Sequence, residues 1–509
     1  MCSIVGFLGL GGTQANSDVE VRMNLALRLM ERRGPDQMAV VRVSPECMLG
    51  GNRLIVRGDQ NVGAIPFADG STTAFYNGEI YNAHIWTDSP CDGGAILPAY
   101  AEHGIRFASQ FDGEFAISLW DDRAGHLLLA RDIFGTKPLF FAIDSTRLIW
   151  ASSEAALSAM AGSFGLCRAV RGPAYQHTYA IQEPYTSYAG IWQLPPAHYL
   201  MASRESLEVG PYFTWDSETY GPETHAADLE ESLWSALRTR LNHSGKIAIP
   251  MSAGIDSGII AFAAEALGCA YHIFSVVSIF GRATVEAHSI RERVSRLTNC
   301  ASITLIDFTI DDYERAMAKM YTDSYHTSEY YDNGALLTHA VMERIADAGI
   351  RVIIDGTGGD ELFDGYDFRA DFAVPNGWPR PWRKQSLYSI FTTLLAYTSK
   401  VDRAGAHFSL EPRFPFQSRL LAEAALRRAS HTKKAPLRKF LLRKLPYGEP
   451  LAPDICGKYG FSMRGCDLKR IRARMRREWC LAHGIESPPG APPVKFPMTV
   501  GRRVQRSVA

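Results

Sequence analysis

The sequence lacks paired cysteines, net charge and long hydrophobic runs. Its 9 cysteines include no Cys-x-x-Cys pair, which argues against a disulfide framework or a zinc site and favours a reducing, cytoplasmic location. The 54 basic residues balance 54 acidic ones, so no overall field favours nucleic acid, membrane or an acidic partner. The first apolar run, in "MCSIVGFLGLGG", is short and lacks a basic flank, which predicts a first strand rather than a secretory signal or membrane span.

The 509 residues show two successive sequence patterns, which predicts two large domains. Residues 1–212 carry many short runs rich in β-branched and aromatic residues and few helical ones, which predicts an antiparallel α+β domain. In residues 228–485, strand-like and helix-like segments alternate, which predicts an α/β domain with a doubly wound parallel sheet. Residues 486–509 are rich in proline and arginine and are expected to form a loosely packed tail.

Two apolar runs of the second region end in glycine-rich turns that carry an aspartate, "KIAIPMSAGIDS" and "IIDGTGGDELFDGY". Ligands of open parallel sheets bind where strands end and helices begin, and backbone N–H groups in such turns suit phosphate oxygens. The alternative is a strand-to-helix turn that needs glycine for its backbone angles and aspartate as a cap. Asp256 and Asp360 at one sheet edge would repel each other, which predicts Mg²⁺ between them and bound phosphates.

Cys2 is a candidate nucleophile. Its small side chain permits removal of Met1, which would leave a free α-amino group beside the thiol. An α-amine with a pKa of about 8 can accept the thiol proton, so one residue supplies nucleophile and base. The alternative is a small buried residue that opens a strand. "NGEIYN" likewise has a plain alternative, since Asn-Gly favours a hairpin turn.

The order of several motifs resembles a known family. Ser252–Ser257 looks like the pyrophosphate loop of the N-type ATP pyrophosphatases, and the wider pattern is similar to the glutamine-hydrolysing asparagine synthetases. The motifs that carry the resemblance are "MCSIVGF", "RRGPD", "NRL", "YNGEIYN", "ARDIFGTKPLFF", "GTGGDELFDGY", "LEPRFPF" and "GKYGF".

The resemblance implies an N-terminal-nucleophile glutaminase, folded as a two-layer β sandwich flanked by helices, in residues 1–212. Cys2 would be its nucleophile, and Asn77 with the backbone N–H of Gly78 would form the oxyanion hole. The residues implied in binding glutamine are Arg53 for its carboxylate, Asp92 for its α-ammonium group, and Glu79.

For the second region the resemblance implies adenylation of a carboxylic acid by ATP with Mg²⁺, followed by capture of the acyl-adenylate by ammonia. Lys458 would balance negative charge in that reaction, although lysines in loops are commonly just exposed. The other implied positions are Ser252, Gly254 and Ser257 on the pyrophosphate, Asp256 and Asp360 on Mg²⁺, Val276 and Gly356 on adenosine, and Thr357 beside the substrate.

Departures from the family pattern gather around the substrates. Gly94 and Ala283 stand where the family tends to have acidic residues, Cys456 replaces an arginine, and Ala253 replaces a loop glycine. At Thr357 the asparagine synthetases have Asp or Glu and the β-lactam synthetases have Tyr. These departures suggest altered glutamine affinity and an acceptor acid other than free aspartate.

Three functions stay open. The leading one is a glutamine-dependent amidotransferase acting on aspartate or a specialised metabolite; the others are a ring-closing amide synthetase of the β-lactam synthetase or lasso-peptide cyclase type, and a non-catalytic sensor. All three take small molecules as partners. The basic run at 469–479 favours a solvated helix face over a nucleic-acid site. The sequence leaves open a homodimer and an ammonia tunnel.

Overall fold

The computed structural model describes residues 1–427 except positions 58, 60, 163–166, 169–183, 185, 187, 216–224, 285, 323–333 and 364–393. The chain forms two compact units, the first built on Met1–Thr214 and the second beginning at Trp215. Within the described ranges, no helix is both long and apolar enough to cross a lipid bilayer.

The first unit contains two six-stranded antiparallel sheets. The first has the order β12-β8-β9-β1-β3-β2 and the second the order β14-β13-β7-β6-β5-β4. The strands of the first sheet are β1 (Ser3–Gly9), β2 (Gln37–Arg42), β3 (Cys47–Arg53), β8 (Phe140–Ile143), β9 (Arg147–Ala151) and β12 (Trp192–Gln193). Those of the second are β4 (Phe67–Ala68), β5 (Thr72–Ile80), β6 (Gly113–Asp121), β7 (His126–Arg131), β13 (His198–Ser203) and β14 (Leu207–Pro211). A separate pair joins β10 (Cys167–Arg168) to β11 (Tyr188–Ala189).

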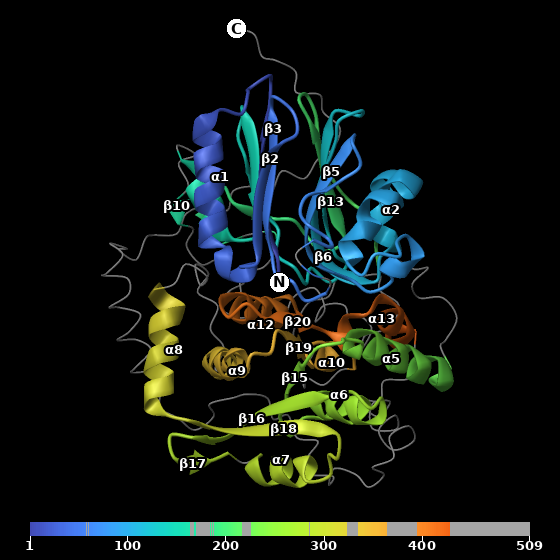
Figure 1. Cartoon of the computed structure of the whole chain (residues 1–509), viewed down its shortest axis with the longest axis vertical. Coiled ribbons are helices and arrows are strands. Elements are labelled where there is room, and N and C mark those ends of the chain that lie inside the picture. The colour runs from blue at the N-terminus through green and yellow to red at the C-terminus, as the bar shows by residue number, and fades with distance from the viewer. Residues whose placement is uncertain are drawn as a thin grey trace, which may run out of the picture. The chain divides into compact units, whose positions relative to one another are not determined.

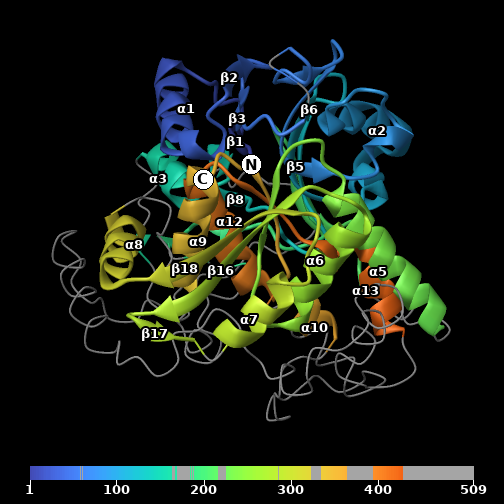
Figure 2. The same cartoon turned by 60° about the horizontal axis from the view of Figure 1, so that its bottom comes forward.

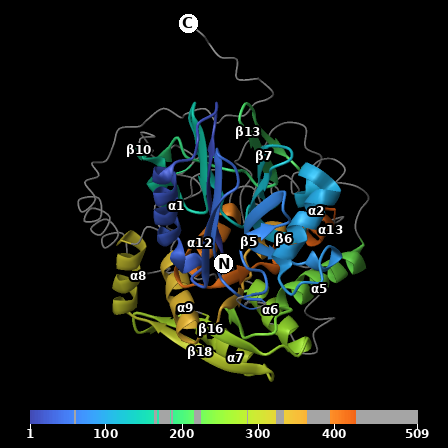
Figure 3. The ribbon, with the colours of Figure 1, turned by 45° about the horizontal axis from the view of Figure 1, so that its top comes forward.

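Three apolar layers hold this unit together. The inner layer lies between the sheets and includes Leu49, Phe75 and Trp150. Helices α1 (Ser17–Leu29) and α3 (Glu154–Ala161) cover the outer face of the first sheet, and α2 (Ile96–His103) covers that of the second. Figures 1 and 3 show α1 and α2 on opposite outer sides of the sheets. The predicted two-layer sandwich flanked by helices is confirmed.

The second unit contains the predicted sheet, in which β15, β16, β18, β19 and β20 are parallel and only β17 is antiparallel among the described strands. Its strands are β15 (Ile247–Pro250), β16 (Tyr271–Ile279), β17 (Arg282–Ala283), β18 (Cys300–Phe308), β19 (Val352–Ile354) and β20 (Glu411–Arg413). Its helices are α5 (Ala226–Leu241), α6 (Ile255–Ala266), α7 (Ala287–Val294), α8 (Ile310–Thr322), α9 (Ala335–Asp347), α10 (Gly359–Leu362), α12 (Leu395–His407) and α13 (Arg419–Leu426).

The strand order reverses between β15 and β19. From β15 the chain moves outward through β16 to β18, then returns to place β19 on the other side of β15. Because parallel crossovers are right-handed, α6 and α7 belong to one face of the sheet and α9 to the other, as Figure 2 shows. A crevice at the carboxyl ends of the strands is expected at such a reversal, and both glycine-rich turns lie there.

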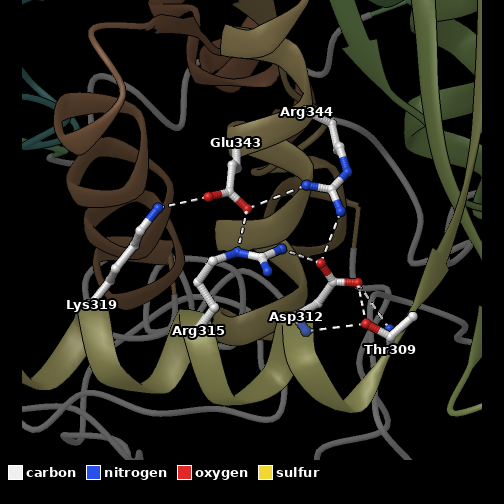
Figure 4. A network of polar contacts seen from close by, with 6 residues as sticks. All are labelled: Thr309, Asp312, Arg315, Lys319, Glu343 and Arg344. Atoms are coloured by element: carbon white, nitrogen blue, oxygen red, sulfur yellow. Dashed lines mark hydrogen bonds and ion pairs between the residues drawn. The ribbon is translucent and has the colours of Figure 1, made fainter.

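A charged network fixes α8 to α9 (Figure 4). Glu343 of α9 accepts hydrogen bonds from Lys319 (2.6 Å) and Arg315 (3.4 Å), both on α8. In return, Arg344 of α9 donates to Asp312 of α8 at 2.8 Å. Since each acid binds bases of the other helix, the network sets the position of α8 along α9.

Candidate active site

The first candidate site surrounds Cys2, a buried residue directly before β1. The backbone N–H of Cys2 donates to Oδ1 of Asn77 on β5 at 3.0 Å. The other end of this amide, Nδ2 of Asn77, is buried and has no hydrogen-bond partner among the described residues. Since a buried donor without a partner costs about 1–3 kcal/mol, this N–H group is poised for a ligand acceptor.

The next residue on β5 has to be glycine. Gly78 has φ +155°, and a Cβ placed on it would lie 1.9 Å from the carbonyl oxygen of Glu114 on β6. The β5–β6 pair, in which Gly78 faces Phe115, leaves no room for a side chain there. The Asn-Gly pair of "NGEIYN" therefore lies within β5, which ends at Ile80, and does not form a hairpin turn.

Two carboxyl groups come together at the end of β5. Both oxygens of the Asp92 carboxylate accept hydrogen bonds, one from the Tyr76 hydroxyl at 2.5 Å and one from the Ile80 N–H at 2.6 Å. Burial and then the nearby charge of Glu79 raise the pKa of Asp92 to about 7, and the two hydrogen bonds and Arg57 oppose this rise. Glu79 itself is buried and forms an ion pair with Arg57, with 3.3 Å between Oε2 and Nε.

Arg53, which the resemblance assigns to the glutamine carboxylate, already holds a loop of its own chain. Its Nη2 donates to the Val62 carbonyl at 2.7 Å, and its Nη1 donates to Gln37 Oε1 at 3.1 Å and to the Asp59 carbonyl at 3.3 Å. A carboxylate ligand would have to share these donors.

Arg33 of the "RRGPD" motif contacts Cys2, although no individual role is predicted for it from sequence. Its buried guanidinium donates from Nε to the carbonyl oxygen of Cys2 at 3.0 Å. Together with Asn77, it fixes both backbone polar groups of Cys2. The place of Arg33 in the "RRGPD" motif is the sequence signal that could have identified it.

The second candidate site is the turn after β15. Three of its N–H groups are engaged within the chain: Ser252 N–H donates to Ser257 Oγ (3.1 Å), and Gly254 N–H donates to Ser252 Oγ (3.0 Å). The Ala253 N–H donates to Glu286 Oε2 at 2.8 Å. These three N–H groups, which the sequence predicts to suit phosphate oxygens, already have acceptors, because hydroxyl and carboxylate side chains compete for them.

Arg293 of α7 supports this turn from beneath. Its Nη1 donates to the carbonyls of Ser252 and Gly254 at 3.0 and 2.8 Å, and its Nη2 donates to that of Ala253 at 2.8 Å. The residue is only 2% exposed. Sequence reasoning missed it, although Arg293 shares the apolar helix face of Ile290 and Val294, an unusual place for an arginine.

An acidic residue does reach the turn, but from another position than expected. Ala283, which stands where the family tends to have an acidic residue, is exposed on β17. Glu286, three residues later, supplies the carboxylate on the Ala253 N–H. Burial raises the pKa of Glu286, while the Ala253 N–H and the charge of Arg293 oppose this rise.

The two glycine-rich turns meet at Asp256. A Cβ on Gly359 would lie 2.5 Å from the Asp256 carboxylate, and one on Gly356 would lie 3.3 Å from the Asp256 Cβ. Glycine at 359 thus leaves a cradle for this carboxylate, one residue before Asp360. No three His, Cys, Asp or Glu side chains gather as a metal site in the described ranges. Two carboxylates completed by phosphate oxygens nevertheless suit Mg²⁺, so these residues fit that ion.

Of the remaining predicted positions, some lie within the residues that the structure describes and others lie outside them. The Thr357 hydroxyl donates to Asp355 Oδ1 at 2.5 Å, so its own chain uses that proton. Val276 is buried within β16. Lys458, Cys456 and the tail at 486–509 lie outside the described residues.

Two family models match successive parts of the chain. Residues 1–213 match the glutamine amidotransferase domain, and residues 228–385 match asparagine synthase. The chain thus contains a glutamine amidotransferase domain followed by an asparagine synthase domain. The family resemblance found in the motifs is thereby confirmed.

The curated proteins that match this chain carry different names. Amidase chyE of Penicillium rubens is 28% identical and the match covers 74% of this chain and 62% of chyE, so this chain spans less than two thirds of that relative. A probable glutamine-hydrolysing asparagine synthetase of Acanthamoeba polyphaga mimivirus is 26% identical, covering 82% and 76%. Asparagine synthetase B of Escherichia coli is 24% identical, covering 84% and 75%. A solved glutamine phosphoribosylpyrophosphate amidotransferase from B. subtilis covers 70% of the chain with a TM-score of 0.32 and 12% identity.

Proposed function

We propose that the protein is a glutamine-dependent, ATP-dependent amidotransferase that converts a carboxylic acid into an amide. Residues 1–212 would release ammonia from glutamine, and residues 228–485 would activate the acid. The observation that carries the proposal is the Asn77 amide, which holds the Cys2 nitrogen with one end and offers a buried N–H group with the other. The names of its relatives, glutamine-hydrolysing asparagine synthetases and amidases, support it.

In the first half, the Cys2 thiol attacks the side-chain amide carbon of glutamine after Met1 has been removed. The α-amino group of Cys2 takes the thiol proton and passes it to the departing ammonia. Negative charge develops on the amide oxygen, where Asn77 Nδ2 and the Gly78 N–H would stabilise it. Water then cleaves the thioester to glutamate and restores the thiol.

In the second half, an oxygen of the acid attacks the α-phosphate of ATP and pyrophosphate leaves. Ammonia then attacks the acyl carbon, forming the amide and releasing AMP. Asp256 and Asp360 would hold Mg²⁺, which when bound neutralises charge on the phosphates. Ser252, Gly254 and Ser257 would bind pyrophosphate once their mutual hydrogen bonds open.

The environment of Thr357 predicts poor use of aspartate. Its hydroxyl is engaged by Asp355, so position 357 offers neither a charge nor a spare proton to the acid. We expect a bulkier or less charged acid to be activated at least about tenfold more efficiently than aspartate, a difference of about 1.4 kcal/mol in transition-state binding.

Acid-dependent pyrophosphate release tests this over a panel of aspartate, N-substituted aspartates and simple aliphatic or aromatic acids, with mass spectrometry of the products. Highest kcat/KM on aspartate with asparagine as product would contradict the specialised-acid proposal and leave an asparagine synthetase. An intramolecular amide would instead favour the ring-closing alternative.

The raised pKa of Asp92 predicts pH-dependent glutamine binding. The ionised carboxylate would hold the α-ammonium group, and with a pKa of about 7 it is mostly protonated below neutral pH. We therefore expect the KM for glutamine to fall roughly tenfold from about pH 6 to about pH 8 and to level off above that range. The Asp92→Asn variant, which cannot ionise, should bind glutamine weakly at every pH. A flat wild-type KM over this range would refute the role of Asp92.

A further inference from the structure

The donor site around Cys2 contains a cation that the family resemblance does not assign. Arg57 lies four residues after Arg53 and pairs with the buried Glu79 at 3.3 Å. Its positive charge also lowers the pKa of Asp92 against the effect of burial. Arg57 thus acts on both carboxylates at the end of β5.

The position of Arg57 is built into the fold. Arg53 donates to the carbonyls of Val62 and Asp59, and at 3.5 Å to the carbonyl of Arg57 itself. At the end of this loop Gly63, with φ +77°, packs so closely that a Cβ there would lie 2.3 Å from the Cys91 Sγ. The loop that carries Arg57 is therefore anchored against Arg53 and Cys91, and its guanidinium is directed to Glu79.

The charges of the residues in this site affect which amide donor the site binds. Free glutamine brings a carboxylate and an α-ammonium group, and the ammonium needs negative charge. Glu79 is already paired with Arg57, and both Asp92 oxygens accept hydrogen bonds. Position 94 adds no acid, because it is a glycine. An α-ammonium group and Arg57 compete for the same carboxylates.

We propose that Arg57 is a specificity-determining residue of the donor site. It offsets the charge that would favour an α-ammonium group, and so raises the selectivity for primary amides that carry a carboxylate but no α-ammonium. The simplest such donor is glutaramate, which is glutamine without its α-amino group. This inference rests on the proposed glutaminase function of the same site.

The test compares kcat/KM for ammonia release from glutamine and from glutaramate in the full-length protein. It is run at about pH 8.5, above the pKa of about 7 of Asp92, so that a change in the ionisation of Asp92 contributes little to the ratio. Removing the charge in Arg57→Gln should shift the ratio of the two constants about fivefold toward glutamine, the upper end for a partly exposed ion pair. Arg57→Lys keeps the charge and should retain the wild-type ratio. Arg22→Gln, which removes an exposed arginine paired with Asp18 on α1, is the matched control and should also retain it.

An unchanged ratio in Arg57→Gln, or a shift toward glutaramate, would overturn the inference. A ratio distinguishes selectivity from a general loss of folding, because a structural defect lowers both constants together. Failure of the proposed function is seen separately: wild-type protein would then release ammonia from neither amide, or Cys2→Ala would release it as fast as wild type.

Discussion

Replacing Cys2 by alanine should abolish amide synthesis from glutamine while leaving synthesis from added ammonium largely intact. The variant loses the thiol that attacks glutamine, but free ammonia reaches the acyl group without the first half of the reaction. Loss of the nucleophile is expected to cost at least about three orders of magnitude in glutamine hydrolysis.

The measurement is amide formation from glutamine and from ammonium chloride, each with saturating ATP and acid. Cys47→Ala is a matched control, because Cys47 is a buried cysteine of β3 in the same unit. Its ratio of the two activities should equal that of wild type. Undiminished glutamine hydrolysis in Cys2→Ala would remove Cys2 from the mechanism.

The second large effect is expected at the switch point of the parallel sheet. Asp256→Asn and Asp360→Asn each remove a carboxylate proposed to hold Mg²⁺, and should slow acid-dependent pyrophosphate release by about two orders of magnitude or more. Gly359→Ala should act similarly although it keeps both acids, because the added methyl group would lie 2.5 Å from the Asp256 carboxylate.

Glutamine hydrolysis should change little in these three variants. Asp311→Asn, at an exposed position in the first turn of α8, controls for the loss of a negative charge. Pyrophosphate release within a few-fold of wild type in both aspartate variants would show that these carboxylates do not bind the metal.

Much of the fold follows from local patterns. The run "KIAIPM" predicts β15 because its residues are apolar and stop at a glycine-containing turn, and the alternation of strands and helices after it predicts a parallel sheet. Sequence spacing also predicts that Asp256 and Asp360 share an edge, since each follows a strand of that sheet.

The parts that sequence did not predict depend on contacts between distant segments. Arg293 occupies a helix of mixed composition, and only folding reveals that its guanidinium binds three carbonyls about forty residues away. The pairing of Arg57 with Glu79 requires the loop after β3 to fold back onto β5. Local propensity contains no information about either contact, because both are set by tertiary packing.

The central claim is that nitrogen from the glutamine side chain becomes the amide nitrogen of the product. It is tested most directly by incubating the protein with ATP, the preferred acid of the panel and glutamine labelled with heavy nitrogen at its side-chain amide. Mass spectrometry should find the label in the product amide, with AMP formed in equal amount, and the Cys2→Ala protein should give no labelled amide. An unlabelled amide from wild-type protein, or a product formed with ADP instead of AMP, would contradict the account.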